Sequence, residues 1–432
     1  MTSAVRHIPP GPSERYNTSQ DLLVWMSDQF SRFGEIFSAS VYGTNVYVVS
    51  DPAGADHVLR RNWQNYKKGQ AIKRIGLLLG NGLMVSEAEL WKSQRRMIQP
   101  AFHEKTIGEL ITVITRGNAE LLEKWRRAAQ SNDSVNITNE ISHMILSIVL
   151  ISIFGDDYEE VAPRLNILSD ESARNIQFAQ TFRPLGKIVA EVAGKRRKER
   201  TKATDILGML MEARDRDSGR AMTDSQLVSE VMTLIVAGHE TTASTLNWVW
   251  YLLSRNSDVE EKLQRELDVL FRNDVVEMRE LSKFVFTRQV IEEALRMYPA
   301  GWLLTRKALR DDQIGDYFVP AGTEIYISPY LIQRHPGHWK DPDRFCPERF
   351  APSQSHNRHE LTMMPFSAGP RKCIGEMLAR VEMQIHLMMI AKHLRLRYAS
   401  ERPVELEAGV NLRCKYDFIM IPEIRQPNGS NC

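Results

Sequence analysis

The pattern of apolar and polar positions along the chain predicts long helices separated by a few short strands. The longest apolar pattern covers residues 223–254, where Thr223 and Gln226 fit a capping box at the start. At 1.5 Å per residue, such a helix would be roughly 45 Å long. Further helices are expected at residues 53–63, 89–130, 137–154, 282–298 and 376–394.

Strands occupy a smaller part of the predicted fold. A β-hairpin is expected over residues 35–50 around Gly43, because β-branched and aromatic residues flank a turn there. Further strands are expected at residues 302–308, 314–319 and 323–328, and terminal hairpins over 396–422. The fold class is therefore mainly α with a small β part.

Composition is that of an ordinary globular enzyme. The 432 residues are 43% hydrophobic and 25% charged, and no Gly/Ser linker or repeat divides them. We therefore expect a single domain over residues 1–432. A net charge of +2 does not favour nucleic-acid binding. The basic run at residues 195–200 is expected to be a solvated helix end.

Neither a membrane anchor nor a disulfide framework is predicted. No apolar run of about 20 residues stands out, and the start from Met1 to His7 lacks a signal-peptide core. We interpret residues 137–154 as a buried core helix. The four cysteines lack paired spacing, which argues against disulfides and a zinc site and favours a cytoplasmic location.

The most informative segment is Phe-Ser-Ala-Gly-Pro-Arg-Lys-Cys-Ile-Gly at residues 366–375. A thiolate at Cys373 could bind iron, because backbone N–H groups and a helix N-terminus would stabilise its charge. Gly369 and Gly375 would let the backbone fold tightly around the sulfur. Arg371 offers a fixed cation for an acidic group. A lone cysteine is more often structural, but the complete string favours a ligand.

This string, beginning at Phe366, resembles the haem-binding loop of the cytochrome P450 family. The resemblance implies the cytochrome P450 fold, with haem between the long central helix and the helix that follows the cysteine loop. It also implies that Cys373 is the metal ligand, through its thiolate, and that the cofactor is haem b, iron protoporphyrin IX.

Ala237, Gly238, His239, Glu240 and Thr241 interrupt the apolar pattern of the long helix. A glycine there costs about 1 kcal/mol relative to alanine. One interpretation is a kink with a satisfied polar pair. The other is a groove for O₂, in which a threonine hydroxyl bonds back to a carbonyl and opens the helix. The resemblance implies that Glu240 relays protons and Thr241 stabilises the activated oxygen, whereas His239 falls at a variable position.

Three further residues match positions that bind the haem propionates in the family, alongside Arg371. Trp91 and Arg95 lie four apart on one helix face, and Arg306 lies in a strand-like segment. A core tryptophan and an ordinary surface arginine are the alternatives.

Glu293 and Arg296 form an i,i+3 pair that would usually be a solvated surface pair. By resemblance they join Arg349 in a buried network that fixes the loop leading to the thiolate. Their predicted role is structural.

The resemblance implies a monooxygenase that inserts one oxygen atom from O₂ into an apolar small molecule, such as a terpenoid, fatty acid or polyketide. Electrons would come from NAD(P)H only indirectly, through a separate ferredoxin or flavodoxin with its reductase. Alternatives are a peroxide-driven or electron-independent haem-thiolate enzyme and a non-catalytic haem sensor. The acid–alcohol pair argues against both.

Two surfaces are expected from the family topology. Segments 66–86, 300–305 and 409–411, with Trp302 and Leu303, should line the substrate pocket. Lys92, Arg96 and Lys372 could dock an acidic redox partner, although ordinary surface charge is an equal alternative.

One segment departs from the family. The interval between Phe154 and Asp205 is shorter than usual, so the lid near residues 180–190 is either truncated or lacks a piece in this sequence. We favour a missing piece, because lids are the least stable part of such folds.

Overall fold

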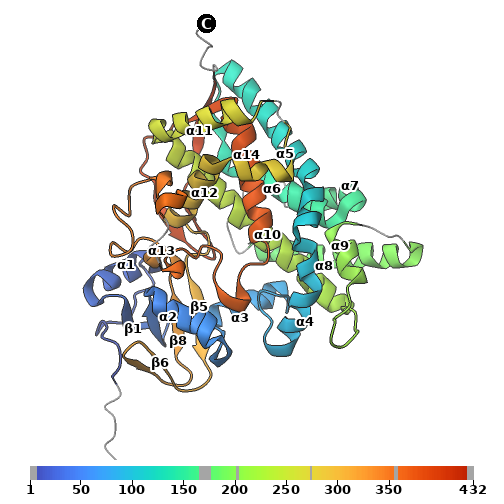
Figure 1. Ribbon diagram of the computed structural model, residues 1–432. Coiled ribbons are helices and arrows are strands. Elements are labelled where there is room, and N and C mark those ends of the chain that lie inside the picture. Colours follow the sequence, from blue (N-terminus) through green and yellow to red (C-terminus); the bar gives the residue numbers. More distant parts are fainter. Residues whose placement is uncertain (1–6, 165–176, 201–203, 273–274, 355–358, 426–432) are drawn as a thin grey trace, which may run out of the picture. The chain divides into compact units, whose positions relative to one another are not determined.

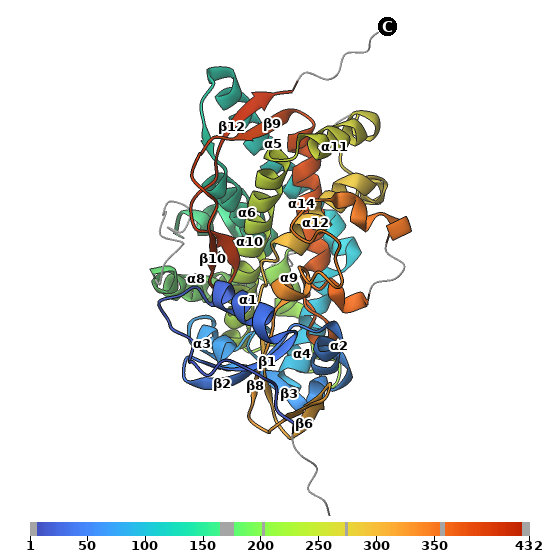
Figure 2. The same ribbon diagram turned by 90° about the vertical axis from the view of Figure 1, so that its left-hand side faces the viewer.

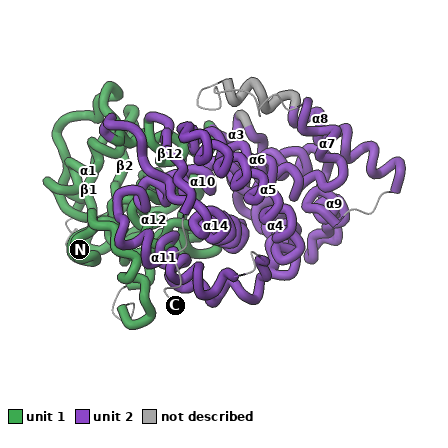
Figure 3. The backbone as a smooth tube through the Cα atoms, turned by 90° about the horizontal axis from the view of Figure 1, so that it is seen from above, with its two compact units in different colours: residues 1–74, 292–373, 404–415 green, residues 75–291, 374–403, 416–432 purple. Residues whose placement is uncertain are grey.

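The computed structural model describes residues 7–164, 177–200, 204–272, 275–354 and 359–425. The chain divides into two compact units, which Figure 3 shows in green and purple. Unit 1 comprises residues 1–74, 292–373 and 404–415, and unit 2 comprises residues 75–291, 374–403 and 416–432. The single-domain expectation stays a prediction.

Unit 1 is built around a five-stranded sheet in the order β1-β2-β8-β5-β3, in which only β2 and β8 are parallel. The predicted hairpin is confirmed: its turn residues Tyr42 and Gly43 both have positive φ, at 49° and 74°, as a type I′ turn requires. Its elements are α1 Leu22–Phe33, β1 Ile36–Val41, β2 Thr44–Val49, α2 Pro52–Asp56, a π-helix His57–Arg61, a 3₁₀ turn Trp63–Asn65, β3 Tyr66–Lys68, β5 Leu304–Ala308, β6 Asp312–Ile314, β7 Tyr317–Val319, β8 Glu324–Ile327, α13 Pro329–Ile332, β10 Leu406–Ala408 and β11 Leu412–Cys414.

Unit 2 is mainly helical. The long helix α10 lies among α5, α6 and α14 (Figure 1), and β4, β12 and β9 form a small sheet whose last two strands run side by side in Figure 2. Its elements are α4 Ala88–Ile98, α5 Glu104–Ser131, β4 Val135–Asn136, α6 Ile137–Phe154, α7 Tyr158–Val161, α8 Gln177–Glu199, α9 Ile206–Glu212, α10 Asp224–Ser254, α11 Ser257–Leu270, α14 Glu376–Ala391, β9 Leu394–Tyr398 and β12 Ile419–Ile424. Helices α3 Gln70–Leu79 and α12 Val285–Met297 run across the unit boundaries.

The capping box predicted at the start of α10 is confirmed. Thr223 Oγ1 accepts the Gln226 N–H at 3.2 Å, and the Gln226 side chain accepts the Thr223 N–H at 2.9 Å. These two bonds satisfy amide groups that the first helical turn leaves without a partner. Helix α10 therefore begins where the sequence predicted.

Two predicted elements are wrong in their extent. Residues 89–130 are not one helix, because Pro100 lacks an amide hydrogen and a short 3₁₀ turn at Gln99–Phe102 separates α4 from α5. Residues 314–319 are not one strand, because Gly315 turns the chain with φ 55° between β6 and β7.

The basic run at residues 195–200 ends α8, but it is not wholly solvated. Arg196 is buried, and its guanidinium binds Asp157 and Asp205 at 2.7 Å each and the Phe154 carbonyl oxygen at 2.7 Å. This arginine therefore joins α8 to the end of α6 and the start of α9.

One described stretch, Ile137–Arg164, is long and apolar enough to cross a membrane by length and composition, because it contains an 18-residue window with a mean hydropathy of 1.7. Our expectation that no such stretch exists was therefore wrong. Within the described structure, α6 packs against α5 and α10, and 61% of the most apolar window is buried, as in a core helix.

The network of Glu293, Arg296 and Arg349 lies buried in unit 1. The Glu293 carboxylate accepts two bonds from Arg296, at 2.7 and 2.9 Å, and one from Arg349 at 2.9 Å. Its Oε1 also accepts the Cys346 amide hydrogen at 3.0 Å, and Arg296 donates to the Gln333 carbonyl at 2.8 Å. The contacts support the structural role predicted for these residues, since they tie α12 to the segment before the cysteine loop.

We expect Arg296→Ala to lower the free energy of unfolding by about 3–5 kcal/mol, because it leaves a buried carboxylate without its main partner. Arg126→Ala is the control: it breaks an i,i+3 pair with Glu123 that is half exposed, which should cost less than about 1 kcal/mol. Urea unfolding of both variants measures the difference. An equal loss of unfolding free energy in both variants would show that the buried Arg296 network stabilises the fold no more than a surface ion pair does.

Candidate functional site

Cys373 ends a closed loop in unit 1. Its amide donates to the Phe366 carbonyl at 3.0 Å, and the Lys372 amide donates to the Gly369 carbonyl at 3.0 Å. Ser367 takes a positive φ of 62°, and Gly369–Arg371 forms a 3₁₀ turn. The loop is thus fixed by its own backbone, while the Cys373 residue stays exposed.

The two glycines of this loop differ in their requirements. Gly369 has φ +71°, and a Cβ there would lie 1.9 Å from the Leu59 carbonyl oxygen of the π-helix, so any side chain would collide with backbone. At Gly375 the φ is −87°, and a Cβ would meet only the Phe102 ring, at 3.7 Å. Gly369 is therefore needed for packing within the protein, whereas the backbone conformation and the described neighbours of Gly375 do not require a glycine.

Helix α10 of unit 2 has an accessible face in its middle. Ala237 is exposed and Glu240 and Thr241 are half-buried, whereas the helix is mostly buried on both sides of them. These three residues are spaced i, i+3 and i+4, and so share one side. A bound group lying against the helix would cover such a face.

The predicted back-bond of Thr241 is present. Its hydroxyl donates to the Ala237 carbonyl oxygen at 2.7 Å. A Cβ on Gly238 would be in ordinary contact with Val149, at 3.4 Å, so the protein itself does not demand glycine there. The Cβ position of Gly238 faces α6.

His239, to which we assigned no role, holds this segment of α10 against α6. It is buried and its Nε2 lies 2.8 Å from Ser142 Oγ of α6. Burial lowers the pKa of His239 to about 4, so the ring is neutral at physiological pH. The hydrogen bond fixes α10 against α6 beside the accessible face.

Two buried acids in unit 2 were not predicted from the sequence. Burial raises the pKa of Glu382 in α14 to about 8, opposed by a bond from the Thr242 hydroxyl. Burial also raises the pKa of Glu230 in α10 to about 7, opposed by the Leu83 amide, which donates at 2.8 Å. A carboxylate inside an apolar helix pattern was the available signal for both.

The four residues predicted to bind the propionates lie on α4, on β5 and in the cysteine loop. On α4, Trp91 is buried and Arg95 is half-buried; between them Gln94 donates to the Asn81 carbonyl at 2.9 Å. In unit 1, Arg306 is buried on β5 and Arg371 is half-buried in the cysteine loop. Their role as propionate partners stays a prediction.

The residues present fit a haem group. The exposed thiol in the closed loop of unit 1 and the accessible face of α10 in unit 2 are each a feature that a large planar ligand would use. Half-buried and buried arginines suit its two carboxylates.

A compact group of Glu35, His335 and His338 is the described cluster that could be considered for a metal ion. His335 Nε2 lies 3.0 Å from Glu35 Oε1, and Nδ1 of the same ring accepts the Gly337 amide hydrogen at 2.9 Å. Since Nδ1 accepts, Nε2 of the neutral ring carries the proton and donates to Glu35. Both ring nitrogens of His335 are therefore engaged in hydrogen bonds, so this ring offers no free lone pair to a metal.

Comparison with known proteins decides the family. A sequence model described as Cytochrome P450 matches residues 14–185 and 163–412. The chain belongs to the cytochrome P450 family. It is accordingly an oxidoreductase, and its helix-rich architecture is the P450 fold. The family implies a haem cofactor.

Individual relatives agree with this P450 assignment. The cyclooctat-9-en-7-ol 5-monooxygenase of Streptomyces melanosporofaciens is 29% identical over 84% of this chain and 83% of its own length. The pentalenene oxygenase of Streptomyces avermitilis is 28% identical over 87% of this chain and 88% of its own. The crystal structure of the cytochrome P450DA haem domain superposes with a TM-score of 0.85 at 22% identity, covering 97% of this chain and 98% of that one.

The two pieces of the family match overlap at residues 163–185, which lie within the short interval between Phe154 and Asp205. Residues 165–176 of that interval lie outside the described residues. Residues 182–186, within the expected lid region, lie inside the continuous helix α8 Gln177–Glu199. That a piece of the lid is missing, rather than that the lid is truncated, stays a prediction.

Two predicted surface roles are weakened by the contacts. Arg96 binds Asp215 at 2.7 Å and Asp217 at 3.0 Å, and Lys92 binds Glu89 at 2.7 Å, so these cations already have acidic partners within the protein. The alternative of ordinary surface charge explains both.

Trp302 is buried in unit 1, and its predicted place in a substrate pocket stays a prediction. Its side chain lies in an apolar cluster of unit 1, and its Nε1 donates to the Gly409 carbonyl at 3.0 Å. The indole therefore positions the loop at residues 409–411.

We expect Glu230→Gln to stabilise the P450 increasingly as the pH rises. The folded chain favours protonated Glu230, so the wild type bears no penalty below the ordinary pKa of 4.5 and the full penalty above about 7. A shift of this size corresponds to up to about 3 kcal/mol. Glutamine still accepts the Leu83 amide hydrogen.

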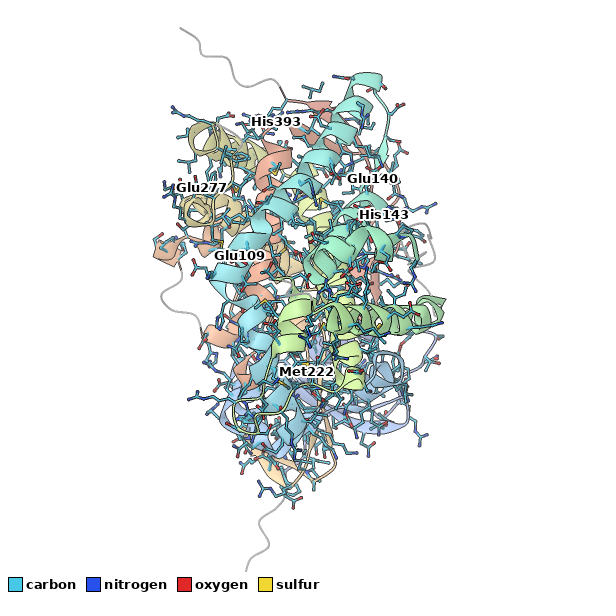
Figure 4. The ribbon with its side chains drawn as sticks, turned by 90° about the vertical axis from the view of Figure 1, so that its right-hand side faces the viewer. Glu109, Glu140, His143, Met222, Glu277 and His393 are labelled. Carbon is cyan, nitrogen blue, oxygen red and sulfur yellow. The ribbon has the colours of Figure 1, made fainter. Side chains whose placement is uncertain are left out.

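Urea unfolding at pH 5 and pH 8 measures the effect, as the difference between variant and wild type. Glu109→Gln on the exposed side of α5 (Figure 4) is the control and should show no such difference. A Glu230→Gln gain that is equal at both pH values would contradict the burial argument.

Proposed function

We propose that this P450 inserts one oxygen atom from O₂ into an apolar terpenoid, by hydroxylation or epoxidation. The observation that carries the monooxygenase reaction is the accessible face of α10, where Thr241 bonds back to Ala237 beside Glu240. The terpenoid class is supported by the names of two relatives, which act on cyclooctat-9-en-7-ol and pentalenene.

Cys373 is the proposed ligand of a haem b iron. When bound, the haem activates O₂, and a thiolate ligand favours cleavage of the O–O bond. The closed backbone of the loop holds the sulfur in place and keeps it accessible. Trp91, Arg95, Arg306 and Arg371 are the proposed partners of the propionates.

The back-bond of Thr241 determines how its hydroxyl can serve the reaction. Because its hydrogen points to the Ala237 carbonyl, the oxygen presents lone pairs to a neighbouring donor. Thr241 therefore acts as an acceptor that orients a water or a bound hydroxyl group. Glu240, one residue earlier and half-buried, is the proposed route by which a proton reaches that position from solvent.

Electrons are proposed to come from NAD(P)H through a ferredoxin or flavodoxin with its reductase, in the cytoplasm. The pairing of Lys92 and Arg96 with acids weakens the case for two of the three docking cations suggested by the sequence. Turnover with peroxide alone would instead favour the peroxide-driven alternative.

Titration with candidate substrates tests the terpenoid class. We expect cyclic terpene hydrocarbons and their alcohols to shift the Soret band of the haem-loaded protein at lower concentrations than fatty acids of similar carbon number. A rigid ring system loses less conformational entropy on binding than a flexible chain. Tighter binding of the fatty acids would overturn the substrate class but leave the monooxygenase reaction standing.

We expect Thr241→Ala to uncouple oxygen use from product formation, because water is no longer oriented at the reacting oxygen. Haem content and substrate binding should stay near wild type, while product per NAD(P)H consumed falls about tenfold and hydrogen peroxide appears. Thr245→Ala is the matched control: Thr245 makes the same back-bond, to the Thr241 carbonyl at 2.9 Å, but is buried. An unchanged product ratio in Thr241→Ala would remove the support for the proton-delivery role.

A further inference from the structure

The π-helix His57–Arg61 packs directly against the cysteine loop. A Cβ on Gly369 would lie 1.9 Å from the Leu59 carbonyl oxygen and 3.3 Å from Arg60 Cγ, so the two backbones are in direct contact. Val58, Leu59, Met364 and Ala368 belong to one buried apolar cluster of unit 1. The position of the loop before Cys373 is therefore set by the position of the π-helix.

A single carboxylate oxygen holds this π-helix and the turn after it. Asp312 Oδ2 on β6 lies 2.8 Å from His57 Nε2, 2.9 Å from Asn62 Nδ2 and 2.5 Å from Tyr66 Oη. His57 is the first residue of the π-helix, Asn62 follows its last, and the Asn62 amide donates to the His57 carbonyl at 2.7 Å. Asp312 thus joins both ends of the π-helix to another part of the chain.

The neighbouring contacts make this attachment specific. The Asn65 side chain donates to the Arg310 carbonyl at 3.1 Å and accepts the Arg310 amide hydrogen at 3.0 Å, and the Asn65 backbone carbonyl accepts the Leu309 amide hydrogen at 2.8 Å. Burial raises the pKa of Asp312, but the bonds from Tyr66 and His57 outweigh it, so the pKa lies below its ordinary value. The anchor is a charged acceptor, and bonds to charged acceptors are stronger than bonds to neutral ones.

We propose that Asp312 is a positioning residue for the haem ligand: by holding His57, Asn62 and Tyr66 it fixes the π-helix, and through the Leu59–Gly369 contact it fixes the loop that presents Cys373. A π-helix is rare and often marks a functional site, because its wide turn moves backbone groups out of their usual places. The proposal rests on the proposed function in one respect, that Cys373 is the ligand.

The first arm of the test is hydrogen exchange of the haem-loaded protein. In Asp312→Ala we expect peptides that cover residues 57–66 and also 366–373 to exchange about tenfold faster, which corresponds to about 1.4 kcal/mol. The Cys373 amide, bonded to Phe366, reports the loop directly. Faster exchange at 57–66 with wild-type exchange at 366–373 would overturn the proposal, because Asp312 would then stabilise only its own surroundings.

The second arm is the spectrum of the reduced carbon monoxide complex, recorded below the unfolding temperature. We expect Asp312→Ala to lower the fraction of the red-shifted, thiolate-type Soret band at least about threefold relative to wild type, because a loosened loop loses the ligand more often. Tyr66→Phe removes one donor without changing shape and should shift both readouts in the same direction by less. If Asp312→Ala does not fold, Tyr66→Phe decides alone.

Two variants separate positioning from general damage. Asp312→Asn keeps an acceptor oxygen and should restore most of the thiolate-type band. Arg61→Ala removes an ion pair with Asp56, at 2.7 Å, from an exposed side chain of the same π-helix that does not contact Gly369, and should leave both readouts at wild-type values. Wild-type readouts in Asp312→Ala and Tyr66→Phe would refute the positioning role. A wild-type protein that lacks the thiolate-type band would refute the proposed ligand, while the exchange arm would still decide the contact.

Discussion

The contact between the Gly369 backbone and the Leu59 carbonyl is the constraint on which the thiolate half of the site depends. It brings residues more than three hundred positions apart into contact, and only glycine with a positive φ can occupy that place. The 3₁₀ turn at Gly369–Arg371 and the bond from the Cys373 amide to Phe366 follow within the same loop. The Glu293–Arg296–Arg349 network then holds the preceding segment, so the loop is fixed from two sides of unit 1.

In unit 2, helix α10 is mostly buried and yet contains a polar segment in its middle. His239 is satisfied by Ser142, Thr241 by the Ala237 carbonyl, and Thr242 by the carboxyl of Glu382. With these groups paired, the helix tolerates Gly238 and an accessible face without unsatisfied polar atoms at those positions. The chemistry proposed for Glu240 and Thr241 therefore stands on a segment that the surrounding helices hold rigid.

Much of this was predictable because it is encoded locally. The turn at Gly43, the capping box at Thr223 and the back-bond of Thr241 involve residues within a few positions of one another, and the family string located Cys373. Other features depend on distant partners. Asp312 contacts His57 across 255 positions, Arg96 meets Asp215 across 119, and Glu230 meets Leu83 across 147. No local pattern could show that Arg96 is already paired or that Asp312 holds the π-helix. Pro100 was a signal for a break in the helix, but the apolar pattern continues on both sides of it, and we therefore predicted one helix.

The central claim is that Cys373 supplies the sulfur ligand to the haem iron. Iron X-ray absorption of the haem-loaded wild type and of Cys373→Ser tests it most directly, because the first coordination shell distinguishes sulfur from oxygen and nitrogen neighbours. Cys346→Ser, which removes a second cysteine of unit 1, is the control. The account predicts one sulfur neighbour in the wild type and in Cys346→Ser, and none in Cys373→Ser. A sulfur neighbour that persists in Cys373→Ser, or none in the wild type, would contradict it.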